Sequence, residues 1–147
     1  MPDLEKIIAE FDPDYRIVHI TAKEPLKFSK VEEALAFSKK VQSILNDFLS
    51  PGRGYMITDY SKIIIDPGLI DTYGQEMRII MDTYLYPNGV ARYGFEITRI
   101  TAKMSHANFL GGTPNLFDTR EEAFEFIRGL TKEEVGVGFK PESDPSA

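Results

Sequence analysis

Hydrophobic residues along this chain follow two kinds of spacing, one typical of β-strands and one typical of α-helices. Short apolar or alternating stretches predict strands at 15–20, 54–60, 90–97 and 115–117, with a further apolar patch at 63–65. Apolar residues three and four positions apart predict helices at 29–49, 66–85, 101–109 and 119–130. The stretch at 4–11 fits either a strand, which would form a hairpin with 15–20, or a helical turn. Strands and helices in alternation predict an α/β fold.

The ends of the predicted helices carry recognisable signals. Residues 29–32 and 119–122 match capping boxes, in which a Ser or Thr and a Glu satisfy the first backbone N–H groups of a helix. Asp66 is a good N-cap, and Pro67 suits the first helical position. The helix that begins there is predicted to end in a turn at 87–89, where Pro, Asn and Gly follow one another.

Length and charge narrow the class of protein. The 147 residues suit one domain, which we expect at 1–130, followed at 131–147 by a polar, flexible tail. A net charge of −6 and a pI near 5.0 oppose binding to phosphate backbones, so nucleic acid is not an expected partner. The lack of cysteine excludes disulfides and thiolate sites and fits a reducing compartment. No stretch is apolar enough to span a membrane, so we expect a cytoplasmic protein.

Two segments resemble parts of the STAS-like superfamily, known from anti-sigma-factor antagonists and sulfate-transporter tails, and its relatives of the CRAL-TRIO lipid-binding type. Residues 56–69 are similar to the family's strand, Asp, turn, apolar patch and helix start, and 115–127 to its last strand and final helix. The similarity extends over 15–130. It implies a single-domain STAS-like mixed β-sheet of four to five strands flanked by amphipathic helices. It also implies binding of proteins, nucleotides or lipids rather than catalysis.

One departure from the family pattern concerns regulation. In the anti-sigma antagonists a serine at this helix start is phosphorylated, whereas this chain has Pro67 between Asp66 and Gly68. The resemblance therefore does not carry that switch over. Ser61 and Thr72 are the nearest hydroxyls to the position and are the candidates for phosphorylation.

The first group of candidate binding residues lies where strands end and helices begin, the edge at which α/β folds usually bind ligands. Asp59, Tyr60 and Ser61 offer an acceptor, an aromatic face and a hydroxyl on one loop. Asp66 and Gly68 follow at the next helix start, although an N-cap role alone accounts for Asp66.

The second group follows the strand predicted at 90–97. Arg99 with Thr101 is able to hold an anion by bidentate hydrogen bonds, although a solvated or surface-paired arginine is the plainer interpretation. His106 is placed on a short helix at the lip of such a site. His19, the other histidine, sits in an apolar strand, where a packed or surface-facing imidazole without a functional role is the simplest interpretation.

These observations favour a regulatory or protein-interaction module of STAS-like type without catalytic activity, docking onto another protein or forming a homodimer. The alternative is a domain that binds a small apolar or anionic ligand, such as a lipid or nucleotide, between the sheet and the helix at 69–85. An enzyme would require His106 to lie close to Asp59 or Ser61 in space. No phosphate-binding loop or metal-ligand spacing occurs, so no cofactor is expected.

Overall fold

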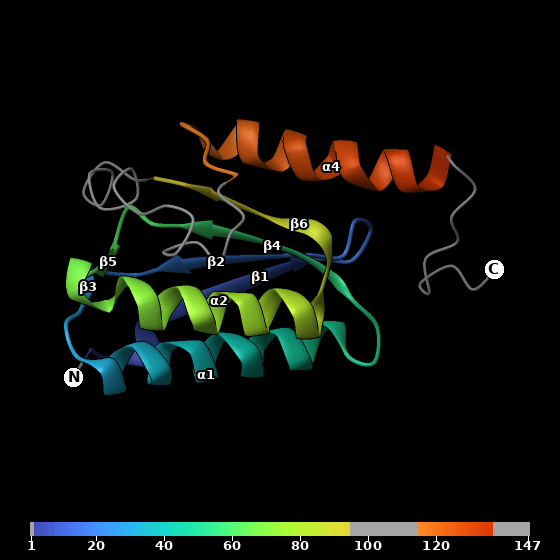
Figure 1. The fold of residues 1–147 in the computed structure, drawn as a ribbon. Coiled ribbons are helices and arrows are strands. Elements are labelled where there is room, and N and C mark those ends of the chain that lie inside the picture. The colour runs from blue at the N-terminus through green and yellow to red at the C-terminus, as the bar shows by residue number, and fades with distance from the viewer. Residues whose placement is uncertain (1, 95–114, 137–147) are drawn as a thin grey trace.

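The computed structural model describes residues 2–94 and 115–136, with 132–136 as helical backbone (Figure 1). The main sheet has four strands: β1 (Ile7–Asp12), β2 (Ile17–Ala22), β4 (Gly54–Asp59) and β6 (Leu85–Tyr93). Their order is β1-β2-β4-β6, with β1 antiparallel to β2 and the other pairs parallel. The carboxyl ends of β2, β4 and β6 therefore lie at one edge of the sheet.

A second, two-stranded sheet pairs β3 (Leu26–Phe28) with β5 (Ile63–Ile65) in parallel. The apolar patch at 63–65 is thus a strand. Its partner β3 was not predicted from the sequence, because three residues are too few to show an alternating pattern.

The described residues form three α-helices, α1 (Val31–Leu49), α2 (Ile70–Tyr84) and α4 (Arg120–Gly136), and two 3-10 turns, η1 (Leu4–Lys6) and η2 (Pro67–Leu69). Figure 1 shows α1 and α2 together on one face of the main sheet and α4 on the other. No described helix combines the length and apolar character needed to cross a bilayer.

Alternate residues of each strand enter different cores, because successive side chains of a strand point to opposite faces. In β4, Met56 packs in the core under α1 and α2, and Ile57 packs in the core under α4. In β6, Val90 packs in the core under α1 and α2, and Ala91 packs in the core under α4. Each parallel strand is consequently buried on both faces, which is typical of strands that have helices on both sides of the sheet.

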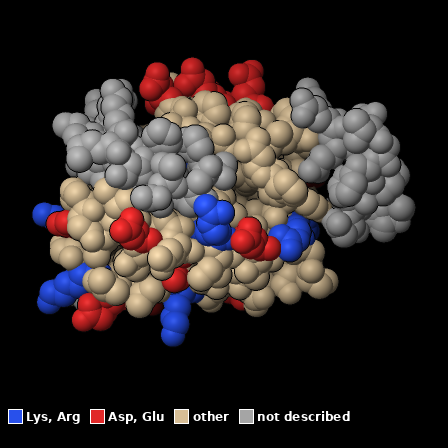
Figure 2. Space-filling view, in the orientation of Figure 1, with Lys and Arg blue, Asp and Glu red and all other residues tan. Residues whose placement is uncertain are grey.

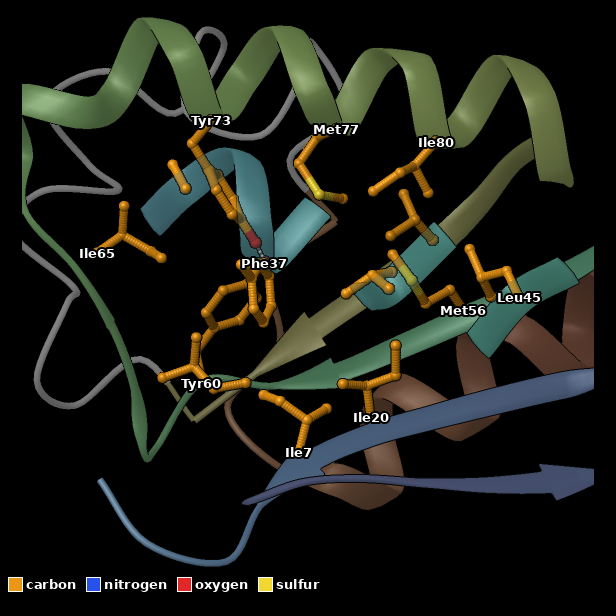
Figure 3. Packing of buried hydrophobic residues seen from close by; sticks show 14 of the residues in the cluster. Ile7, Ile20, Phe37, Leu45, Met56, Tyr60, Ile65, Tyr73, Met77 and Ile80 are labelled. Atoms are coloured by element: carbon orange, nitrogen blue, oxygen red, sulfur yellow. Dashed lines mark hydrogen bonds between the residues drawn. The ribbon is translucent and has the colours of Figure 1, made fainter. Parts of the chain in front are cut away.

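The core between the sheet and the two helices is filled by large side chains (Figure 3). Tyr73, Met77 and Ile80 project from α2 toward the sheet, where they meet Phe37 of α1 and Met56 of β4. The rings of Phe37 and Tyr73 stack with their centroids 6.0 Å apart. The space between α2 and the sheet is therefore occupied by the protein's own core.

The predicted turn at 87–89 is wrong. Helix α2 ends at Tyr84, and β6 begins directly at Leu85 and continues through these residues. The register of β6 against β4 shifts between Leu85 and Val90, and Asn88 has a φ of 62°. Pairing with β4 overrides the local turn tendency, which survives as an irregularity within the strand.

The capping box at the start of α1 lies one residue later than predicted. The helix begins at Val31, and the carboxylate of Glu33, not that of Glu32, accepts hydrogen bonds from the N–H groups of Ser29 (2.7 Å) and Lys30 (3.2 Å). These bonds lower the pKa of Glu33, because they stabilise its charged form.

The predicted fold class, a single α/β domain with a mixed sheet flanked by helices, is confirmed. The strand expected at 115–117 is present as one parallel bridge between Leu116 and Arg92 beside β6. Helix α4 extends past the predicted domain end at 130 to Gly136. The helix expected at 101–109 lies outside the described residues.

Candidate functional site

Asp59 and Ser61 form a turn at the end of β4. The Asp59 carboxylate accepts a hydrogen bond from the Ser61 N–H at 2.9 Å, and Gly94, with a φ of 80°, packs directly against this carboxylate. Tyr60, predicted to offer its ring at the same loop, is fully buried, and its hydroxyl pairs with that of Tyr73. The Tyr60 ring therefore belongs to the core rather than to a binding surface.

Asp66 caps η2. Its carboxylate accepts a hydrogen bond from the Gly68 N–H at 2.8 Å, which is the N-cap arrangement that the sequence indicated. Gly68 is exposed and Thr72 half-buried in the first turn of α2. The structure thus places Asp66 and Gly68 together at a helix start. Arg99, Thr101 and His106, predicted as the second half of the site, lie outside the described residues.

A different site, which we call the His19 groove, lies between the β1–β2 hairpin and α4. Its volume is about 180 Å³. Its lining residues are Glu10, Phe11, Asp12, Ile17, His19, Arg120, Phe124 and Arg128.

Regular secondary structure brings these side chains together. Glu10 and Asp12 are two positions apart in β1 and so project from the same face of the hairpin, and Glu10 lies directly opposite His19 of β2. Arg120 and Arg128 are separated by eight residues of α4, so they lie on one helix face with Phe124 between them.

The helical wall of the groove is positively charged. The Arg120 guanidinium lies 4.6 Å and that of Arg128 5.2 Å from the centroid of the Phe124 ring. Neither arginine forms an ion pair with another described residue. The outer side of α4 is acidic (Figure 2, top), with Glu121 and Glu125 exposed. Arg120 and Arg128 line the groove, whereas Glu121 and Glu125 are not among its lining residues.

The base of the groove is a buried histidine–tyrosine pair. The His19 side chain is 8% exposed, and its Nε2 forms a 2.7 Å hydrogen bond with the Tyr93 hydroxyl. Its Nδ1 is buried without a hydrogen-bond partner and lies 3.9 Å from the exposed Glu10 carboxylate. The Phe124 ring packs edge-on against the imidazole, with centroids 5.2 Å apart.

The surroundings keep both members of this pair neutral at pH 7. Burial and, secondarily, the Arg120 charge lower the pKa of His19, and the nearby carboxylates Glu10 and Asp59 oppose that change less strongly. Burial and the Asp59 charge raise the pKa of Tyr93 to about 12. The neutral phenol is a poor nucleophile and a poor base, so the pair is suited to hydrogen bonding rather than to proton transfer.

A second polar cluster lies within the core under α2. Arg92 of β6 is fully buried beside Tyr60 and Tyr73. Burial lowers the pKa of the guanidinium, while the two tyrosines act in the opposite direction, and burial raises the pKa of Tyr73 well above its usual value. Because these side chains are enclosed, we assign this cluster to the core.

Sequence reasoning missed the His19 groove because its residues come from three distant segments. It interpreted His19 as a packed or surface-facing imidazole without a functional role, and the structure shows that the ring is buried. The available signal was the spacing of Arg120, Phe124 and Arg128, which predicts one mixed basic and aromatic face of the final helix.

Within 2–94 and 115–136, no group of three or more His, Asp or Glu side chains is arranged to hold a metal ion. Comparison with known protein families finds no family model that matches this chain, and comparison with curated proteins finds no match either.

Proposed function

We propose that the protein is a non-catalytic docking module that binds another protein through the His19 groove. The observation that carries this proposal is the pair of guanidinium groups, Arg120 and Arg128, which line the groove without ion pairs to described residues. Arginine beside an aromatic ring is typical of protein interfaces, because both side chains contribute strongly to binding. An arginine-lined groove on a chain with a net charge of −6 marks a local site for a partner's acidic groups.

The resemblance to the STAS-like superfamily supports the same class of function, since members of that family bind partners rather than turn over substrates. The order of elements on which this resemblance is based is the β1–β2 hairpin, the long helix α1, the buried strand β4, and helix α2, which begins at Ile70 after the 3-10 turn that Asp66 caps. A homodimer is one form of such docking, in which the acidic outer side of α4 in a second copy would supply the carboxylates.

The polar pair at the base of the groove supports a role without catalysis. The phenol of Tyr93 has a pKa of about 12, and His19 is held neutral by burial. Among the described lining residues of the groove there is no serine, threonine or lysine that would act as a nucleophile.

A second candidate function is the binding of a small anion in the same groove. It is favoured by His19 Nδ1, which is buried at the groove without a hydrogen-bond partner and could serve as a donor. The ligand position expected from the sequence, between α2 and the sheet, is filled by Tyr73, Met77 and Ile80.

The test is affinity capture from an extract of the source cells with three matched baits. These are the unmodified protein, the double variant Arg120→Gln, Arg128→Gln, and the control Arg78→Gln, which alters an exposed arginine on α2. We expect a set of partners that the double variant loses at least tenfold and the control retains. Partners retained equally by all three baits would contradict docking through the groove. Native mass spectrometry of the same three proteins distinguishes the alternatives. A bound small molecule that depends on the two arginines would favour the second candidate. A dimer that depends on them would indicate self-association.

A further inference from the structure

The two arginines of the His19 groove have a defined separation. Eight residues of α-helix correspond to a rise of about 12 Å, so the Cα atoms of Arg120 and Arg128 stand about that far apart along α4. Phe124 lies midway between them and is buried against the sheet at 7% exposure. The two guanidinium groups lie 4.6 Å and 5.2 Å from the centroid of this ring, so the wall presents two positive charges with a small exposed part of the ring between them.

An extended peptide has a matching period. Its residues rise about 3.3 Å each, so the first and fifth are about 13 Å apart, and the first, third and fifth side chains point to the same side. Acidic side chains at the first and fifth positions would each reach one guanidinium. A side chain at the third position, preferably apolar, would face the small exposed part of the Phe124 ring.

The opposite wall of the groove restricts where the acidic groups of a partner can lie. The Glu10 carboxylate is 74% exposed, and Asp12 uses its carboxylate to accept the N–H of Asp14 at 3.0 Å. Both would repel a second row of carboxylates placed along β1. Acidic side chains are therefore accommodated along α4 and disfavoured along the hairpin, which fixes the side of the segment that faces the helix.

We infer that the His19 groove recognises an extended segment of a partner protein with acidic side chains at its first and fifth positions and an apolar side chain at its third. This inference rests on the proposed docking function and specifies the chemistry of the partner. It assigns Arg120 and Arg128 as the specificity-determining residues. Recognition of acidic motifs by pairs of arginines is a common mode of peptide binding, because the guanidinium forms charge-assisted hydrogen bonds with carboxylates.

The direct test is a fluorescence anisotropy titration with two short labelled peptides of identical composition. In one, the two glutamates flank a central leucine at the first and fifth positions, and in the other they are adjacent. We expect the spaced peptide to bind on the order of tenfold more tightly, and Arg120→Gln or Arg128→Gln to reduce its affinity by a similar factor. Arg78→Gln should leave the affinity unchanged, and Arg128→Lys should retain part of it, because the charge remains.

A charge-reversal variant distinguishes loss of binding from damage to the fold. The double variant Arg120→Glu, Arg128→Glu should lose the acidic peptide and bind the corresponding peptide with lysines at the first and fifth positions. Circular dichroism should show that its helix content is unchanged. Equal affinity for the spaced and adjacent peptides, or no dependence on the two arginines, would overturn the inference.

Selection from an unbiased peptide library separates failure of the inference from failure of the docking function. Peptides that require Arg120 or Arg128 but lack the spaced acidic pair would overturn the inferred partner chemistry and leave groove docking intact. If no selected peptide depends on either arginine, both the inference and the proposed docking site fail. Enrichment of the spaced acidic pair would support both.

Discussion

His19 has the most unusual environment of the described titratable side chains at the groove. Its imidazole is enclosed by Tyr93 and Phe124, with one nitrogen bonded to a phenol and the other without a hydrogen-bond partner. Burial disfavours the charged form, and the neighbouring Arg120 adds to that effect. The residue therefore positions Tyr93 and shapes the groove floor while remaining uncharged at neutral pH.

This environment predicts a pH dependence of stability. The folded-state pKa of His19 is below its ordinary value, so between that ordinary value near 6.5 and the lower folded pKa the unfolded state binds more protons. The His19 contribution to the free energy of unfolding is thus fully present above pH 6.5 and decreases as the pH falls below it. Denaturant unfolding at several pH values should show a shallower decrease between pH 7.5 and 5.5 in His19→Gln than in the unmodified protein.

The second histidine supplies the control for this measurement. His106→Gln should retain the decrease that is assigned to His19. If the slope is the same in His19→Gln and in the unmodified protein, burial of a neutral imidazole is not what sets the pH dependence.

A second prediction at the residue scale concerns Asp59. Because its carboxylate accepts the Ser61 N–H and contacts Gly94, we expect Asp59→Ala to lower the free energy of unfolding by about 1 kcal/mol. Asp59→Asn keeps an acceptor oxygen and should cost less. Thermal and urea unfolding measure both changes. An unchanged melting temperature in Asp59→Ala would instead fit a surface carboxylate that serves binding alone.

Among the elements, α4 determines whether the groove exists. It is the only described helix on its face of the main sheet, and its buried residues Ala123, Phe124 and Ile127 form the core there. Its N-terminus is secured by the predicted capping box, in which the Thr119 hydroxyl accepts the Glu122 N–H at 3.2 Å and the Glu122 carboxylate accepts the Thr119 N–H at 3.3 Å.

The cap gives a third prediction. Thr119→Ala removes the hydroxyl acceptor and should destabilise the protein by about 1 kcal/mol. The control is Thr83→Ala at an exposed position within α2, where alanine favours the helix and no loss is expected. Amide hydrogen exchange of α4 should quicken in Thr119→Ala, and equal exchange in both variants would show that the cap does not hold this helix.

The long helices could be predicted from the sequence, whereas a short strand and the part of a strand that depends on pairing could not. Helices α1, α2 and α4 each carry several turns of periodic apolar residues with local start signals, so the sequence alone was sufficient to locate them. Strand β3 is three residues long and depends on its partner β5. The course of β6 through 87–89 depends on pairing with β4, which local composition does not reveal.

The candidate site was less predictable than the fold, because function depends on contacts between distant segments. The sequence identified Asp59, Ser61, Asp66 and Gly68 near strand ends, and the structure shows these residues in turn and cap hydrogen bonds. The His19 groove joins positions 10–19 to positions 120–128, a contact that no local pattern encodes. Only the basic and aromatic face of the final helix was visible in the sequence.

At the scale of the whole molecule, the two faces of the sheet differ in what covers them. One face carries α1 and α2 over a large apolar core, and the other carries α4 among the described elements (Figure 1). Among the described residues, the larger core lies under α1 and α2, and the His19 groove lies beside α4 on the hairpin side of the second face. The larger described core and the proposed docking groove therefore lie on opposite faces of the sheet.

Charge at this scale gives a fourth prediction. The protein has a net charge of −6, yet its proposed binding surface uses two arginines, so attraction to an acidic partner is local. Because such attraction between exposed charges is screened, raising the salt concentration from about 0.05 M to 0.5 M should weaken binding of the spaced acidic peptide several-fold. Isothermal titration at both concentrations measures this, and an affinity that does not respond to salt would exclude the guanidinium groups as its main source.

The most direct test of the central claim is an NMR titration of isotope-labelled protein with the spaced acidic peptide. Docking in the His19 groove predicts that the amide signals that shift most belong to β1, β2 and α4, in particular Ile17, His19, Phe124 and Arg128. Shifts confined to α1 and α2, or no shifts at a peptide concentration well above that of the protein, would contradict the claim that this groove is the docking site.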